Sequence, residues 1–344
     1  MGLADVVGQD RAVGLVRRAL SGGHLAHAFL FSGPDGVGKT LAAYGFAQAL
    51  LCPTVPGDGC GRCSTCQRVS RDTHPDVFVL ASEEQRVARG TLARADLAGT
   101  PSRDIKVEQV RKLQARLVRR PLEASRQVAL VLDAERLNVA AQNAFLKTLE
   151  EPPGDVVLVL VTSAPQRLLS TLHSRLAHVG FGALAQDVIA TLLQKQGVEE
   201  ALAQQAAALA EGSLGRAQRF SAPDIAERQA TVVAFEEITS KDFRPVLRFA
   251  ETYGDSREHA ERTLSWLLLW NRDVAREQAV PTAGAPGGMG EGLLNLRRQV
   301  ASKLSPTALV RRHELLESAR AWVAERNASP RLAMEKMLLT GWGR

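Results

Sequence analysis

The stretch from His27 to Thr40 reads HAFLFSGPDGVGKT and joins an apolar run to a glycine-rich loop. The run at 27–32 predicts a buried strand, and the loop precedes a helical pattern. The loop matches the complete pattern G-x-x-x-x-G-K-T, which in a strand–loop–helix context is highly specific for phosphate binding. We therefore expect an α/β domain built around this loop.

The loop supplies each kind of group that a nucleoside triphosphate requires. Its three glycines let backbone N–H groups close around the phosphates at a helix N-terminus. Lys39 adds a positive charge, and Thr40 offers a hydroxyl to Mg²⁺. The glycines are Gly33, Gly36 and Gly38. These residues predict a site for ATP with Mg²⁺, and the alternative is a loop kept as a structural turn without nucleotide.

Four further apolar runs predict strands, at residues 77–80, 128–132, 156–161 and 177–181. Helical patterns lie between them at 107–120 and at 138–151, the second capped by Asn138 and stopped by two prolines. This alternation is typical of a parallel sheet covered by helices. The polar stretch 83–102 has little periodicity and predicts an exposed insertion.

From about residue 183 the pattern becomes helical throughout, which predicts an all-α second half. Trp266 and Trp270 lie four residues apart, so we expect them in a helix–helix core, with nucleic-acid stacking as the alternative. The Pro- and Gly-rich stretch 281–292 predicts a loop between two helices.

Length and composition limit the possible classes. The chain has 344 residues, which predicts two or three domains. It has no apolar run of about 18 residues and no signal-peptide pattern, so we expect a cytoplasmic protein without a membrane span. A net charge of +6, from 43 basic and 37 acidic residues, is compatible with an anionic polymer as partner but does not require one.

The strand predicted at 128–132 ends in Asp133, where a carboxylate can orient the water shell of a metal ion. The next residue is Ala134, and Glu135 follows one position further. Adjacent residues at a strand end point in different directions, so Glu135 misses an attacking water unless the strand ends early and a turn redirects it. ATP binding is therefore better supported than ATP turnover.

All four cysteines lie between residues 52 and 66. Their spacing is C-x7-C-x2-C-x2-C, and the residues are Cys52, Cys60, Cys63 and Cys66. In a reducing compartment this spacing predicts a closed, structural Zn²⁺ site with four sulfur ligands. The alternative is a redox-active C-x-x-C pair.

Two segments carry a resemblance to a known family. Residues 6–9 read VVGQ and resemble the adenine-side segment of the clamp-loader branch of the AAA+ proteins. Residues 143–153 read NAFLKTLEEPP and resemble the characteristic helix of that branch. The resemblance covers roughly the first 220 residues.

The resemblance also assigns residues at four places. Asp133 takes the Walker B position, and Thr162, which precedes Ser163, takes the sensor 1 position. Residues 212–217 resemble sensor 2 and bring Arg216 near the γ-phosphate. Residues 174–176 read Ser-Arg-Leu where the family has Ser-Arg-Cys. That match implies that Arg175 is a trans arginine finger, and an ordinary surface arginine is the alternative.

The family plan implies three domains: an AAA+ P-loop domain at 1–181 with the zinc module at 52–66, a helical lid at 182–222, and a helical collar at 223–344. It implies a subunit of the DNA polymerase III holoenzyme that is not itself the polymerase. The implied partners are the gamma/tau and delta subunits in a hetero-pentamer, the sliding clamp, and primer–template DNA held through its phosphates.

The family's motor subunits carry Asp-Glu at Walker B, whereas this chain has Asp133-Ala134-Glu135 and stops at Arg344. This difference favours a non-motor partner subunit. An ATPase motor of the same loader is the first alternative, and a branch-migration helicase motor, which shares the AAA+ core, is the second.

Overall fold

The computed structural model describes residues 2–22, 25–97, 99–238, 243–280, 291–324 and 328–341. The chain forms two compact units, the first made of Met1–Ile189 and Glu211–Arg216 and the second of Ala190–Ala210 and Ala217–Arg344. We refer to them as the sheet unit and the helical unit.

The sheet unit contains five parallel strands in the order β2-β3-β4-β1-β5. Their bounds are Ala28–Ser32 for β1, Val77–Leu80 for β2, Gln127–Val131 for β3, Val156–Thr162 for β4 and Ala177–Gly180 for β5. All five strands predicted from the apolar runs are confirmed, and β1, which leads into the phosphate loop, lies inside the sheet.

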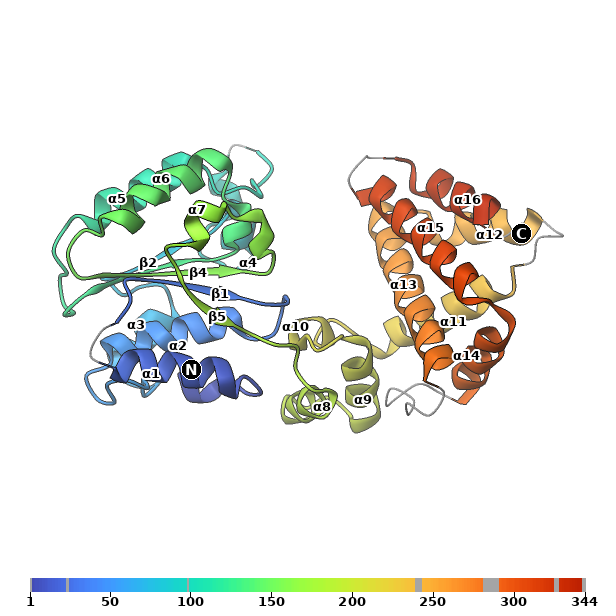
Figure 1. Cartoon of the computed structure of the whole chain (residues 1–344), viewed down its shortest axis with the longest axis horizontal. Coiled ribbons are helices and arrows are strands. Elements are labelled where there is room, and N and C mark those ends of the chain that lie inside the picture. The colour runs from blue at the N-terminus through green and yellow to red at the C-terminus, as the bar shows by residue number, and fades with distance from the viewer. Residues whose placement is uncertain are drawn as a thin grey trace. The chain divides into compact units, whose positions relative to one another are not determined.

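Helices cover both faces of this sheet (Figure 1), with α1, α2 and α3 over one face and α5, α6 and α7 over the other. Their bounds are Asp10–Ser21 for α1, Lys39–Leu51 for α2, Ser64–Ser70 for α3, Val107–Leu117 for α5, Val139–Glu150 for α6 and Ser170–His173 for α7. The predicted α/β class is confirmed.

The apolar runs lack polar alternation because each strand is buried on both faces. In β1, Phe29 and Phe31 pack into the core beneath α1 and α2, while Ala28 and Leu30 pack into the core on the opposite face. The cap predicted for α6 is confirmed, since the Asn138 side chain accepts a hydrogen bond from the Ala141 N–H at 2.8 Å. Such a cap contributes about 1 kcal/mol.

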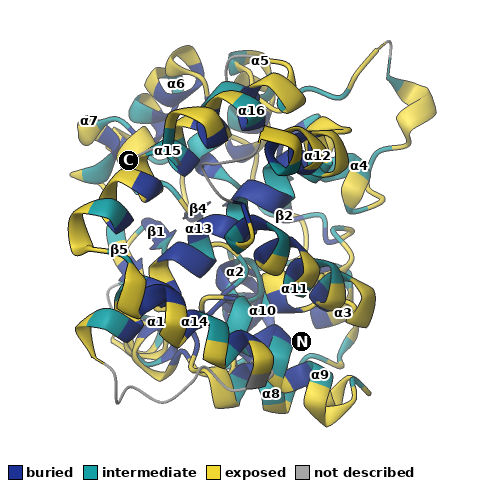
Figure 2. Ribbon diagram, turned by 90° about the vertical axis from the view of Figure 1, so that its right-hand side faces the viewer, coloured by how far each residue is buried: buried dark blue, intermediate teal, exposed yellow. Residues whose placement is uncertain are grey.

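The stretch 83–102 is more ordered than its composition suggests. It contains α4, Glu83–Ala88, and a 3₁₀ turn, Arg94–Asp96, and Figure 2 draws much of it in the colours of intermediate and exposed residues. Ser82 caps α4 by accepting a hydrogen bond from the Gln85 N–H. Six residues are too few for a periodic pattern, so no helix could be predicted there.

All described elements after β5 are helices, as expected. They are α8, Gln186–Lys195; α9, Glu200–Leu209; α10, Leu214–Ala217; α11, Ala222–Glu236; α12, Phe243–Tyr253; α13, Arg257–Ala279; α14, Glu291–Lys303; α15, Pro306–Ala324; and α16, Pro330–Gly341. Residues 281–290 of the predicted loop at 281–292 lie outside the described residues. Among the described helices, none is long and apolar enough to cross a membrane.

The core of the helical unit forms around α13. Trp266 and Trp270 are both buried, as predicted for a helix–helix core. The Trp270 Nε1–H donates to Glu236 at 2.5 Å, and Arg312 pairs with the same carboxylate. A second buried pair joins Arg297 to Glu277 at 2.5 Å.

Candidate nucleotide site and cysteine cluster

The phosphate loop runs from the end of β1 to the first residue of α2, so its N–H groups lie at a helix N-terminus. Two of its glycines occupy positions that no larger residue could take. At Gly33, φ is 150°, and a Cβ would lie 2.2 Å from the carbonyl oxygen of Phe181. At Gly36, φ is 69°, and a Cβ would lie 2.3 Å from the Ser213 hydroxyl oxygen.

The loop is held from two directions. The Gly215 N–H donates to the Gly36 carbonyl at 3.1 Å, so the segment 211–216 contacts the loop directly. Gln9 is buried on the other side, where its side-chain amide donates to the carbonyl oxygens of Val37 at 3.3 Å and Gly182 at 2.7 Å. Gln9 and its neighbours line a pocket of about 430 Å³ with residues 180–182.

Lys39 is buried at the first turn of α2, and its ammonium donates to the Pro34 carbonyl at 2.6 Å. Burial lowers the pKa of this ammonium, and the negative charges of nearby carboxylates, with Asp35 foremost, oppose that effect. Thr40, the next residue, is half-buried.

The backbone turns directly after β3, which the sequence allowed but did not require. The strand ends at Val131, Asp133 adopts a left-handed conformation with φ of 49°, and Ala134–Arg136 form a single 3₁₀ turn. The strand therefore ends early and a turn redirects the next acidic residue. Burial, assisted by the negative charges of Glu135 and Asp35, raises the pKa of Asp133.

Glu135 lies against the end of β4. Its Oε1 accepts hydrogen bonds from the Ser163 hydroxyl at 2.5 Å and the Ser163 N–H at 3.2 Å. Burial alone would raise the pKa of this carboxyl, but the hydrogen bonds from Ser163 and Thr162 outweigh it and lower the pKa. Its other oxygen, Oε2, is buried and accepts no hydrogen bond from the described residues.

The predicted acidic and polar residues thus gather beside the loop. The charges of Glu135 and Asp133 both act on the Lys39 ammonium, and Thr162 is buried at the end of β4. Arg216 instead pairs with Glu211 at 2.6 Å and remains half-exposed. Gln9, Asp35 and Ser163 lie in segments that the sequence singles out, but their contacts could not be predicted, because side-chain contacts between distant segments leave no local pattern in the sequence.

Arg175 follows the short helix α7 and lies at the surface of the sheet unit. Its guanidinium pairs with Glu150 at 2.7 Å and donates to the Thr171 carbonyl at 3.0 Å. Its side chain is 37% exposed. Glu150 ends α6, within the segment that resembles the clamp-loader helix.

The residues around the loop fit a nucleotide with Mg²⁺. The loop glycines leave a cradle that a Cβ would fill, and the buried Glu135 Oε2 lacks a donor among the described residues. Lys39 is suited to the phosphates, and Thr40 and Asp133 are suited to the ion and its water shell.

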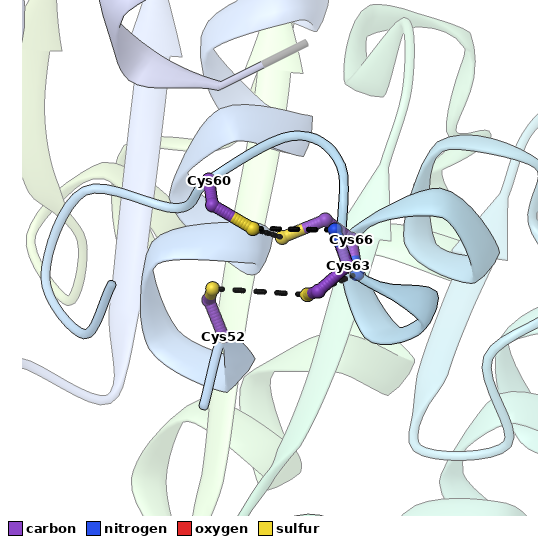
Figure 3. A group of neighbouring side chains, drawn as sticks. All are labelled: Cys52, Cys60, Cys63 and Cys66. Carbon is purple, nitrogen blue, oxygen red and sulfur yellow. Dashed lines mark hydrogen bonds between the residues drawn. The ribbon is translucent and has the colours of Figure 1, made fainter. Parts of the chain in front are cut away.

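The four cysteines meet between the end of α2 and the start of α3 (Figure 3). All four sulfur atoms lie within 4.8 Å of one another, and the Cys52–Cys63 and Cys60–Cys66 pairs are each 3.9 Å apart. Four sulfurs around a tetrahedral Zn²⁺ at about 2.3 Å would lie about 3.8 Å apart. None of the four cysteines forms a disulfide.

The surroundings of the sulfurs differ. Backbone N–H groups of Arg62 and Cys63 lower the pKa of the Cys60 thiol to about 6, whereas burial raises the pKa of Cys66 to about 12. The N–H of Cys66 points at the Cys63 sulfur at 3.4 Å. The donor set and its spacing can hold a metal ion.

A parallel sheet of this strand order, a phosphate loop after its inner strand β1, and acidic and polar residues at the ends of β3 and β4 define a P-loop domain of the AAA+ class. Residues 8–185 match the family model described as DNA polymerase III, delta subunit. The chain belongs to this family.

Two curated relatives and one solved structure extend the comparison. The chain is 31% identical over 325 residues to DNA polymerase III subunit delta' of Pseudomonas aeruginosa, covering 92% of each chain. It is 25% identical over 360 residues to subunit gamma/tau of Mycobacterium tuberculosis, covering 96% of this chain and 59% of that one. The Thermotoga maritima RuvB Holliday junction branch migration motor is 17% identical with a TM-score of 0.43, covering 88% of this chain and 84% of that one.

Proposed function

We propose that this chain is the delta-prime subunit of the bacterial DNA polymerase III clamp loader, which helps load the sliding clamp onto primed DNA with ATP. The observation that carries the proposal is the match to a delta' subunit over 92% of both chains. The gamma/tau relative extends well beyond the aligned region, since only 59% of it is covered.

In this proposal the sheet unit binds ATP with Mg²⁺ between the phosphate loop and the β3 and β4 ends. The cysteine cluster binds one structural Zn²⁺. The partners are the gamma/tau and delta subunits in a hetero-pentamer, the sliding clamp, and primer–template DNA contacted through phosphates. The three-domain division at residues 181 and 222 and a cytoplasmic location belong to the same proposal.

Arg175 is the residue through which this subunit would act on a neighbour. Its guanidinium is partly exposed, and its contacts with Glu150, the Thr171 carbonyl and the Ser174 hydroxyl are surface contacts that another subunit's phosphate could replace. An arginine supplied in trans stabilises the charge on a transferred phosphoryl group. The pair with Glu150 would hold the side chain in place until a neighbour binds.

The test is ATP turnover by the assembled loader with primed DNA. Arg175→Ala should reduce ATP turnover about 10³-fold at the one site that receives this arginine. Total turnover of the loader should fall by the fraction that this site contributes. Arg167→Ala removes an exposed arginine from the same region and serves as the control. Assembly, measured by size-exclusion chromatography, should not change, and a normal rate for Arg175→Ala would rule out the finger.

A second candidate is a catalytically active motor like gamma/tau. The observation in its favour is the turn at Asp133, which brings Glu135 to the β4 end with one buried oxygen available to a water molecule. A carboxylate there could polarise the attacking water.

A further inference from the structure

The outer edge of the sheet at β2 is open. On the β3 side, the Asp76 carbonyl accepts from the Val128 N–H at 2.9 Å, and the Leu80 carbonyl accepts from the N–H of Leu132, just after β3, at 2.8 Å. Successive residues of a strand direct their backbone groups to opposite edges, so those of Val77 and Val79 face away from β3. The Val77 N–H donates to His74 at 3.2 Å. The Val79 N–H and both valine carbonyls have no hydrogen-bond partner among the described residues.

This edge forms the floor of a groove of about 390 Å³, which we call the β2 groove. One wall is α5, which contributes Lys112 and Arg116, and the other is the end of α4, which contributes Arg86 and Arg89. Phe78 and Val79 in the floor are only partly buried. The backbone edge can therefore be reached from solvent.

The β2 groove is strongly positive. Four cations line it against one carboxylate, Asp72, and that carboxylate already pairs with Arg89 at 2.9 Å and accepts from the Tyr44 hydroxyl at 2.6 Å. The remaining cations are Arg86, Lys112 and Arg116, and no carboxylate in the described part of the chain pairs with them. The groove therefore favours a ligand of negative charge.

We propose that the β2 groove binds a short acidic polypeptide segment of a partner protein, which adds to β2 as a further strand. Free N–H and C=O groups on a sheet edge recognise an extended peptide backbone, and flanking cations select its acidic side chains. Four residues of β2 present about 13 Å of edge at 3.3 Å per residue, enough for a four-residue match.

Nucleic acid is a poorer occupant of the same groove. Single-stranded nucleic acid is held by aromatic side chains on which its bases stack. The one aromatic residue in the lining is Phe78, and the Arg116 guanidinium already lies over its ring at 5.9 Å. A sugar–phosphate backbone also cannot pair with the N–H and C=O groups of β2. Cations beside an edge further discourage pairing with neutral or basic strands, which sharpens the selection for an acidic one.

Fluorescence anisotropy with the full-length chain tests the proposal. The probes are fluorescein-labelled octapeptides of alternating Val and Glu, or of alternating Val and Lys. The Glu peptide should bind saturably, and the Lys peptide at least ten-fold more weakly. The double variant Lys112→Glu and Arg116→Glu should bind the Glu peptide at least ten-fold more weakly. The control, Arg111→Glu with Arg119→Glu, makes the same charge change outside the groove and should shift affinity less than two-fold.

A second pair of variants separates strand addition from simple charge attraction. Val79→Pro removes the outward N–H without touching the ladder to β3, and it should abolish binding, whereas Val79→Thr should retain it. A normal circular dichroism spectrum checks that each variant folds. Three results would overturn the proposal: no saturable binding of the Glu peptide up to about 1 mM, full binding by Val79→Pro, or displacement by an oligo-dT of equal charge.

Discussion

The backbone conformation of Asp133 determines where the carboxylate of Glu135 lies. Its left-handed conformation, with φ of 49°, turns the chain between β3 and the next helix. Non-glycine residues rarely adopt this conformation, and Asp is among those that do so most often. The spacing Asp-Ala-Glu predicts a displaced Glu135, yet the turn brings its carboxylate to the end of β4. The sign of one φ angle decides this, and sequence spacing cannot reveal it.

At this scale we predict the effect of Glu135→Gln on ATP turnover by the purified chain. If the carboxylate polarises water, turnover should fall by about 10²–10⁴-fold, because general-base catalysis contributes that much. Affinity for ATP should change little, since the phosphates are held by the loop. Glu108→Gln, on the exposed side of α5, is the control. Equal turnover by Glu135→Gln and the unmodified chain would show that Glu135 takes no part in ATP hydrolysis.

The segment from the end of α2 to the start of α3 carries the four cysteines of the proposed zinc site. Its sequence is rich in glycine and offers little apolar surface, so packing alone provides few contacts. In the proposed zinc site, the four sulfurs would order this segment by binding one metal ion. A structural zinc site can contribute about 10 kcal/mol to folding. The spacing of the cysteines was enough to predict the cluster, because all four cysteines lie within fifteen residues of sequence.

We predict one zinc per chain, measured by atomic absorption after purification without chelator. Ellman's reagent should detect few thiols in the native protein and four after EDTA treatment, because the chain has no cysteines outside the cluster. Removal of the metal should also lower the thermal unfolding midpoint. Four thiols that react at once in a zinc-free, fully stable protein would contradict the metal site.

Across the whole molecule, the two units differ in how much of their structure could be predicted from the sequence. The strands and the phosphate loop of the sheet unit are continuous motifs and were predicted nearly residue by residue. For the helical unit, only helix content and the buried tryptophans could be predicted. Its ion pairs join residues far apart in sequence, such as Arg312 with Glu236, so no local pattern marks them.

The buried pair between Arg297 and Glu277 gives a prediction about this unit. Glu277→Ala leaves a buried guanidinium without its partner, which should cost about 3–5 kcal/mol in free energy of unfolding. Glu317→Ala breaks an exposed pair with Arg320 and should cost less than about 1 kcal/mol. Urea denaturation measures both. Glu277→Ala should still bind ATP at low urea, because the phosphate loop belongs to the sheet unit. Loss of ATP affinity together with the loss of stability would show that the two units do not unfold independently.

The contact between Gly215 and Gly36 has a mechanical consequence. The chain leaves the sheet unit after residue 189, returns for residues 211–216, and leaves it again. The returning segment is bonded to the phosphate loop, and both of its ends continue into the helical unit. The hydrogen bond between Gly215 and Gly36 therefore links the phosphate loop to a six-residue segment that is joined covalently to the helical unit at both ends.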